Sequence, residues 1–177
     1  MITKSKTVKP IPEGYHTVTT WIITKDTSQL IDFVKKAFNA HSDVRIYNED
    51  GTIGHAEVRI GDSVVMMFDK REEWPETPSF IRLYVEDGDA VYEQAIKAGA
   101  TSVTKMTNLF FGDRVGRVRD PLGNLWWIQT HIEDLDPEEM TKRAGQSEYI
   151  DAMQYVQTSL HFSLSESKIN MGNQYKK

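Results

Sequence analysis

The chain has 177 residues, carries a formal net charge of −5, and 39% of its residues are hydrophobic. That composition suits one ordinary domain or two half-size modules, and an acidic chain without a basic stripe argues against a nucleic-acid surface. The absence of cysteine excludes disulfides, thiolate nucleophiles and cysteine-based zinc sites. No signal-peptide core or transmembrane-length stretch is present, so we expect a cytoplasmic protein without a membrane partner.

The first half of the chain predicts a strand, a helix and three further strands. Two prolines interrupt residues 1–14, and β-branched and aromatic residues then favour a strand. Apolar residues at helical spacing follow, up to Asn39, which suits a left-handed C-terminal position. Gly61-Asp62 predicts a tight hairpin turn. The predicted elements are a strand at Tyr15–Thr24, a helix from Asp26 to Asn39, and strands at Val44–Tyr47, His55–Ile60 and Ser63–Phe68.

The second half repeats this order at an offset of about 60 residues. Its predicted elements are a strand at Ser79–Val85, a helix at Asp87–Ala98, and strands at Thr101–Met106, Gly112–Arg119 and Leu125–His131. Two copies of one unit predict an α+β fold, in which paired βαβββ modules form a curved mixed sheet around a cleft. We expect a lead-in at 1–14, modules at 15–69 and 79–131, a charged linker at 70–78, and a tail at 132–177.

The tail is predicted to be helical and then flexible. Asp136-Pro137 has the features of a helix start, an N-cap followed by proline at the first helical position. A second amphipathic stretch follows, and from Ser163 the chain is polar. Its apolar stripe can dock on its own sheet or on a second subunit, and the sequence leaves both open. That stripe consists of Tyr149, Met153, Val156 and Leu160.

The segments that open each hairpin carry a resemblance to a known family. Gly54 to Ser63 reads GHAEVRIGDS, Gly112 to Gly123 reads GDRVGRVRDPLG, and His131 to Leu135 reads HIEDL, with PEEM beginning at Pro137. With the order of elements, these motifs resemble the vicinal-oxygen-chelate superfamily, which includes glyoxalase I, extradiol dioxygenases and the bleomycin- and fosfomycin-resistance proteins. The PhnB-like branch is the most similar. The resemblance implies the paired-module fold and a homodimer.

Enzymes of this superfamily typically bind a divalent metal with side chains from the first and last strands of each module. Carried over one at a time, these positions are Thr20 and Met66 in the first module and Phe80 and Trp127 in the second. A divalent ion such as zinc takes imidazole nitrogen or carboxylate oxygen, which thioether, phenyl and indole groups do not offer. We therefore expect the family metal to be absent and predict no cofactor.

The alternation of these strands instead predicts an apolar, aromatic lining for the cleft, as is usual for a small-molecule site. Arg82, Tyr84 and Gln129 are candidates to orient a ligand that carries oxygen or negative charge. The alternative is that the same side chains fill the cleft as core. The predicted ligand-binding residues are Thr20, Met66, Phe80, Arg82, Tyr84, Trp127 and Gln129.

His55 and Glu57 are the remaining candidates for a metal. Residues i and i+2 share one face of a strand, so the imidazole and the carboxylate can converge, with His16 or His131 completing a displaced triad. An ordinary hydrogen-bonded pair is the preferred interpretation. An acid–base role for His55, Glu57 or His131 stays open, although no catalytic residue is assigned.

Arg114, Arg117 and Arg119 form a short cationic series. They suit either an anion contact or local ion pairing around the Asp120-Pro121 turn, and the second interpretation is preferred.

Three functions follow. The leading one is a metal-independent small-molecule binder, similar to the drug-sequestering resistance proteins. The alternatives are a metal-dependent lyase, isomerase or dioxygenase with a displaced site, and a non-catalytic assembly protein with a filled cleft and an associating tail.

Overall fold

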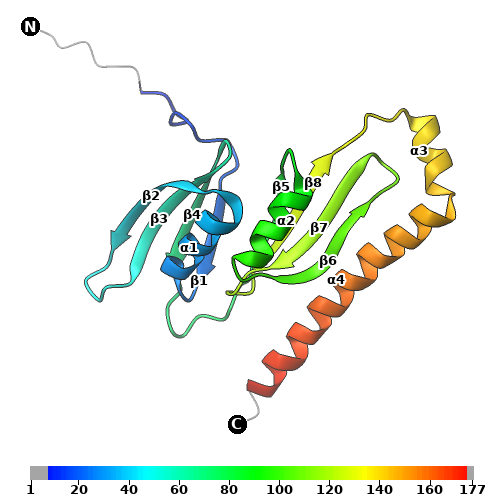
Figure 1. The fold of residues 1–177 in the computed structure, drawn as a ribbon. Coiled ribbons are helices and arrows are strands. Elements are labelled where there is room, and N and C mark those ends of the chain that lie inside the picture. Colours follow the sequence, from blue (N-terminus) through cyan, green and yellow to red (C-terminus); the bar gives the residue numbers. More distant parts are fainter. Residues whose placement is uncertain (1–7, 175–177) are drawn as a thin grey trace, which may run out of the picture. The chain divides into compact units, whose positions relative to one another are not determined.

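The structure, a computed structural model, describes the backbone of residues 8–174 and the side chains of residues 8–165 (Figure 1). Its contacts divide the chain into two compact units. The first contains residues up to 35 and residues 39–77, and the second contains residues 36–38 and the chain from residue 78 onward. No helix in the described part is long and apolar enough to cross a membrane.

The first unit contains one helix and a four-stranded mixed sheet in the order β1-β4-β3-β2. β1 runs parallel to β4, and the other two pairings are antiparallel. The helix begins at Asp26, whose carboxylate accepts a hydrogen bond from the Gln29 amide at 2.8 Å, and ends at Asn39 in the left-handed conformation. The elements are β1 (Thr20–Thr24), α1 (Thr27–Phe38), β2 (His41–Tyr47), β3 (Ile53–Ile60) and β4 (Ser63–Asp69).

The second unit repeats this topology, with a four-stranded sheet in the order β5-β8-β7-β6. The α+β fold predicted from the sequence, two βαβββ modules followed by a helical tail, is confirmed, whereas the placement of the modules around a cleft stays a prediction. The elements are β5 (Phe80–Tyr84), α2 (Gly88–Lys97), β6 (Thr101–Asn108), β7 (Asp113–Arg119), β8 (Leu125–His131), α3 (Pro137–Ala144) and α4 (Ser147–Gln174).

The repeat extends to one hydrogen bond that ties each module's helix to its last strand. The Thr27 amide donates to Asp69 Oδ1 at 2.7 Å, and the Gly88 amide donates to Thr130 Oγ1 at 2.8 Å. Both bonds span 42 residues. Each satisfies one of the amides that a helix leaves without an internal partner in its first turn. The two modules therefore form the same hydrogen bond between helix and last strand, with a carboxylate acceptor in one and a hydroxyl acceptor in the other.

Alternate strand positions supply the core of each unit. Ile22 and Met67 are fully buried in the first sheet, as are Trp126 and Ile128 in the second. In the second unit this face lies under α2, because a side chain added at Gly116 would meet Tyr92 of that helix. The residues between these positions, such as Trp127, therefore lie on the opposite face.

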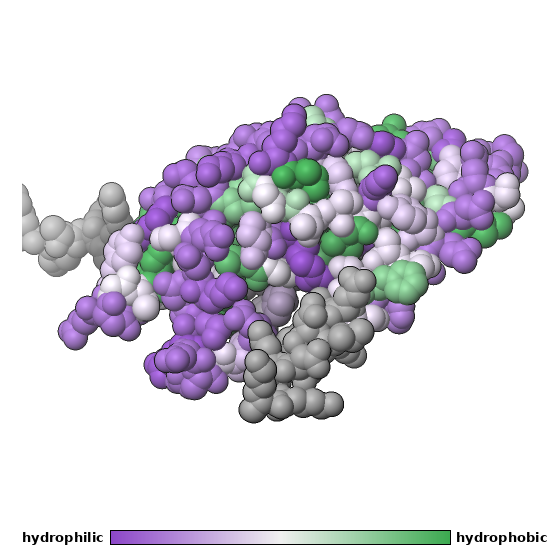
Figure 2. Space-filling view, turned by 60° about the horizontal axis from the view of Figure 1, so that its bottom comes forward, coloured by the Kyte–Doolittle hydropathy of each residue, from purple (hydrophilic) through white to green (hydrophobic). Residues whose placement is uncertain are grey.

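Large hydrophobic side chains also remain on the surface. Trp21, Val44 and Ile46 of the first sheet are each at least half exposed. On the face of the molecule in Figure 2, hydrophobic residues form several separate patches among hydrophilic ones. Scattered apolar residues of this kind are ordinary on a protein surface.

The turn between β7 and β8 is held by one buried carboxylate. Asp120 accepts hydrogen bonds from the amides of Leu122 and Asn124, the Asn124 side chain and the Trp126 indole, all at 2.9 Å. Among the residues that the structure describes, no arginine forms an ion pair with Asp120, so the expectation that ion pairs hold this turn is wrong. Arg119 instead donates to the Gly123 carbonyl and to Ser163 of α4.

The tail docks on the chain's own second sheet. Figure 1 shows α4 running along β6. Val156, only 3% exposed, packs with Leu109 and Val115 in a hydrophobic cluster that Met153 also joins, which agrees with the predicted stripe. Polar bonds flank this cluster, including the Lys105 amide to the Tyr155 hydroxyl at 2.9 Å. α4 runs on to Gln174, past the point from which the sequence predicts a flexible end.

We expect Asp120→Ala to lower the free energy of unfolding by about 3 kcal/mol or more, because it leaves several buried donors without an acceptor. Urea denaturation measures the change. Asp62→Ala is the matched control, since Asp62 lies in the equivalent turn of the first module with its side chain 87% exposed. A loss for Asp120→Ala no larger than that for Asp62→Ala would contradict the prediction.

We expect Val156→Asp to detach α4 from the second sheet, because an unpaired carboxylate cannot be buried in an apolar cluster. The free energy of unfolding should fall by about 3 kcal/mol. Amide hydrogen exchange in β6 should rise with it, as the covering helix is lost. Gln157→Asp, which adds the same charge at the next and exposed position, should change neither quantity. Equal exchange in the two variants would refute this account.

Candidate functional site

Five of the predicted ligand-binding residues lie together on one face of the second sheet. β5 and β8 are parallel neighbours, with Arg82 paired to Trp127 and Tyr84 to Gln129. Paired residues of neighbouring strands point to the same side, and residues two apart on one strand share that side. Phe80, Arg82 and Tyr84 therefore share the face of Trp127 and Gln129, opposite α2.

Trp127 lies at the centre of this face. The Phe80 ring stacks against its indole with the centroids 6.1 Å apart and an interplanar angle of 26°. The guanidinium of Arg82 lies 4.2 Å from the centroid of the indole, and that of Arg117 lies 3.9 Å from it. Phe80, Arg82 and Trp127 line a cavity of about 150 Å³, which we call the Trp127 pocket.

The C-terminal helix lies beside this pocket. Trp127 packs against the cluster formed by Leu109, Val115 and Val156, and the last of these belongs to α4. Arg117 donates to the Val156 carbonyl at 2.8 Å and to the Thr104 hydroxyl at 3.1 Å. The helix thus covers part of the open face and leaves Phe80 53% exposed.

Arg117 is a member of the site that the sequence reasoning did not place there. The sequence places Arg117 in a cationic series on one strand. In the structure it is 3% exposed and lies opposite Trp127 in the β7–β8 pairing. Of the other two members of that series, Arg114 forms an ion pair with Asp89 at 2.6 Å on the exposed surface. The hairpin turn at Asp120 could have revealed the position of Arg117, because the turn fixes which residues of β7 and β8 are opposite.

Three buried polar atoms on this face have no hydrogen-bond partner. They are Arg117 Nε, Trp127 Nε1 and Gln129 Oε1. Within the described residues, only Thr24 and Thr27 have other buried side-chain atoms in this state. A buried polar group without a partner costs about 1–3 kcal/mol, so most proteins pair such groups. Three of the five described residues with such an atom thus lie on this face.

A buried carboxylate fixes the far end of the same face. Asp113, 6% exposed, accepts hydrogen bonds from the Gln129 side-chain amide and from His131, whose Nδ1 lies at 2.6 Å. His131 Nε2 lies 2.9 Å from Asp134 Oδ1. The bonds to Asp134 and Asp113 raise the pKa of His131. Both ring nitrogens of His131 are engaged, and Tyr84, 64% exposed, stands apart from this network.

The first module differs from the prediction by one residue in register. Thr20 pairs with Val65, and Trp21 pairs with Met66. The expectation that Thr20 shares the face of Met66 is therefore wrong, since a slip of one residue turns a side chain to the other face. The equivalent pairs are Trp21 with Met66 and Arg82 with Trp127, at one constant offset (82 − 21 = 127 − 66 = 61).

His55 and Glu57 converge on this face of the first sheet as a hydrogen-bonded pair. His55 Nε2 lies 3.0 Å from Glu57 Oε1, and the Tyr15 hydroxyl donates to Glu57 Oε2 at 2.5 Å. The bond from Tyr15, and then that from His55, lowers the pKa of Glu57. Both carboxylate oxygens thus have partners. His16 is exposed on another segment, 4.0 Å from Asp62.

The residues at the family's metal positions do not fit a divalent ion. The positions that the resemblance implies, Thr20, Met66, Phe80 and Trp127, present no imidazole or carboxylate. Neither do Trp21 and Arg82, which pair with Met66 and Trp127. Nor do the residues that the structure describes contain a group of three or more histidines, aspartates and glutamates that could hold a metal. The donor chemistry thus disagrees with the superfamily's metal centre.

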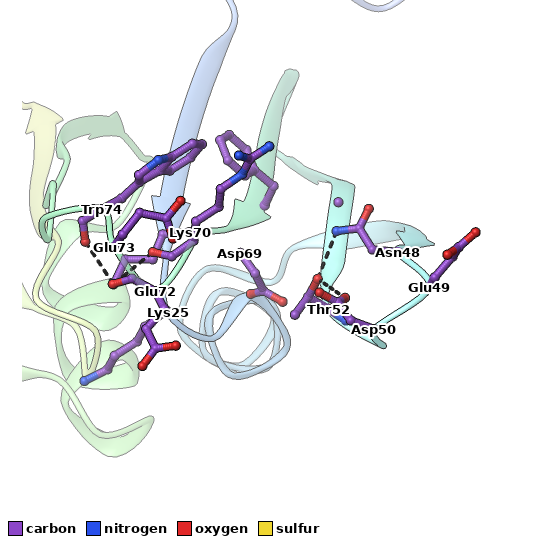
Figure 3. Close-up of a pocket in the computed structure, with 13 residues that line it drawn as sticks. Lys25, Asn48, Glu49, Asp50, Thr52, Asp69, Lys70, Glu72, Glu73 and Trp74 are labelled. Carbon is purple, nitrogen blue, oxygen red and sulfur yellow. Dashed lines mark hydrogen bonds between the residues drawn. The ribbon is translucent and has the colours of Figure 1, made fainter.

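A larger hollow of about 1090 Å³ in the first unit is polar (Figure 3). Several of its charged groups form hydrogen bonds that hold the surrounding loops. Lys70 Nζ donates to the backbone carbonyls of Arg71, Glu72 and Trp74, and Asp69 accepts from the amides that begin α1 and β3. We therefore assign the residues of this hollow a structural role in holding these loops.

The sequence pattern of the Glyoxalase/Bleomycin resistance protein/Dioxygenase superfamily matches residues 15–128. An uncharacterized protein of Mycobacterium bovis is 34% identical over 130 residues, which are 67% of this chain and 86% of that protein. A counterpart in Mycobacterium tuberculosis has the same identity over 76% of its length.

Two solved structures share the fold. TioX from a Micromonospora species matches with a TM-score of 0.55 at 24% identity, over 65% of this chain and 99% of its own. The fosfomycin resistance protein FosX from Listeria monocytogenes matches with a TM-score of 0.54 at 15% identity, over 71% and 97%. Together with the match to residues 15–128, this places the chain in the Glyoxalase/Bleomycin resistance protein/Dioxygenase superfamily.

Proposed function

We propose that this protein binds a small aromatic molecule in the Trp127 pocket, without the metal ion typical of its superfamily. The observation that carries the proposal is the stack of Phe80 on Trp127 beside a cavity of about 150 Å³. A cavity of about this volume accommodates a molecule of the size of benzene. Apolar walls with a few fixed polar groups are the usual composition of a small-molecule site.

An open pocket is favoured over a cleft filled by its own side chains. α4 covers the part of the face formed by β6 and β7, yet Phe80 of β5 is half exposed and Arg82 is exposed. A filled core would bury both rings of the stacked pair. The position of α4 on its own sheet also weakens the assembly alternative, because the stripe that was a candidate for association is used within the chain.

A metal-dependent lyase, isomerase or dioxygenase is the weaker alternative. It would need ligands displaced from the family positions, with His55 and Glu57 as the candidates. In the structure this pair is engaged with Tyr15, and the described residues supply no third ligand beside it. Assembly as a homodimer and membership of the PhnB-like branch remain proposals from the resemblance, and light scattering tests the first. A cytoplasmic location remains a proposal from the composition of the sequence.

We expect a panel of single-ring aromatic compounds to contain members that change the tryptophan fluorescence in a saturable way. Trp127→Phe should abolish the change, because it removes the reporting indole. Phe80→Ala should weaken binding about tenfold, in keeping with the loss of a stacked ring and its apolar area. Phe162→Ala removes a comparably exposed ring from α4 and should have no effect. The absence of saturable binding across the panel would contradict the proposed function.

We expect the untagged protein, purified without chelators, to contain far less than one equivalent of zinc, nickel, iron or manganese by mass spectrometry. The reason is the donor set at the family positions, which lacks imidazole and carboxylate groups. The result should hold after attempts at reconstitution. Near-stoichiometric metal that is lost in His55→Ala would show that the site is displaced and would bring the enzyme alternative forward.

A further inference from the structure

We infer that the ligand of the Trp127 pocket is a single-ring aromatic carboxylate, whose anionic group pairs with Arg82 beside the buried positive charge of Arg117. This inference rests on the proposed function and adds the charge of the ligand to it. The argument combines the charge at the pocket, the burial of Arg117 and the geometry of the ring stack.

Two positive charges flank the indole that lines the pocket: Arg82 lines the pocket itself, and the buried Arg117 lies against the same ring. The guanidiniums of Arg82 and Arg117 both lie within 4.2 Å of the centre of one indole. Within the described residues, neither forms an ion pair. Three other arginines do form ion pairs, Arg45 with Asp43, Arg114 with Asp89 and Arg143 with Glu133, whereas Arg59, Arg71 and Arg119 form none with the described residues. Two like charges gathered at one ring leave a local excess that an anion would neutralise.

The charge of Arg117 is buried, so the excess of positive charge beside Trp127 has a cost in free energy. Its side chain is bonded only to the Thr104 hydroxyl and the Val156 carbonyl, and its Nε has no partner. Burial, followed by the charge of Arg82, lowers the pKa of Arg117 to about 10. A buried charge is stabilised by a paired opposite charge with hydrogen bonds. The resting site lacks such a partner.

The geometry selects a planar anion attached to a ring. The cavity of about 150 Å³ between Phe80, Arg82 and Trp127 suits one aromatic ring. Arginine binds carboxylates through two parallel hydrogen bonds, a geometry that a planar carboxylate on the ring satisfies. The alternative, in which both guanidiniums serve only to pack against the indole, predicts no preference for an anion.

Calorimetric titration of the full-length protein with benzoate, benzamide and benzamidine tests the inference. These probes have one ring and nearly the same shape, with negative, neutral and positive substituents. We expect benzoate to bind at least tenfold more tightly than benzamide, and benzamidine to bind most weakly. Added salt should weaken the binding of benzoate and leave that of benzamide nearly unchanged, since it screens only the charged interaction.

Arg82→Gln should reduce the ratio of benzoate to benzamide affinity to about one, because it replaces the exposed guanidinium by a shorter, uncharged polar side chain. Arg71→Gln is the matched control. Arg71 lies 5.4 Å from the ring centre of Trp74 in the first unit, so its loss removes a charge next to another indole. The ratio in this control should equal that of the parent protein.

The outcomes separate the two proposals. If benzamide or benzamidine binds as tightly as benzoate, the ligand is not selected for negative charge, and the inference is overturned while the proposed function stands. If none of the three probes and no member of the aromatic panel binds, both are overturned. A preference for benzoate that persists unchanged in Arg82→Gln would also refute the role of Arg82.

Discussion

The buried Asp120 carboxylate closes the β7–β8 hairpin, and the arrangement of the second unit depends on this turn. By binding the amides of Leu122 and Asn124 and the indole of Trp126, it fixes the register of the two strands. That register directs Trp126 into the core and Trp127 to the opposite face, with Arg117 across from it. A shift of one residue would exchange the two tryptophans and remove the pocket.

The two modules share a backbone plan and differ in what their open faces carry. Each uses the same bond between the start of its helix and its last strand, with Asp69 in one and Thr130 in the other. In the second module a helix from outside the repeat covers β6, and the rest of the face forms the Trp127 pocket. The repeat thus accounts for the fold, and the added helix accounts for the asymmetry within it.

Membership of the superfamily leaves the chemistry of this chain open, because one fold can host unrelated sites. The positions at which the resemblance implies metal ligands, Thr20, Met66, Phe80 and Trp127, offer neither imidazole nor carboxylate. In the second module, the indole of Trp127 is stacked by the Phe80 ring and flanked by the guanidiniums of Arg82 and Arg117. Such a site is suited to recognising a flat, charged molecule by contact, and no acid–base or nucleophilic step follows from these groups.

The sequence by itself determined the order of elements, the repeat, the apolar stripe of α4 and the shared face of Phe80 and Arg82. These features depend on the periodicity of residues close together in the chain. That Trp127 lies on the same face as Phe80 followed from the family resemblance. Only the tertiary structure decided that Trp21, not Thr20, shares the face of Met66, that α4 packs on its own sheet, and that Arg117 joins the pocket. Strand register and helix docking depend on contacts between residues distant in the chain, and local periodicity does not specify them.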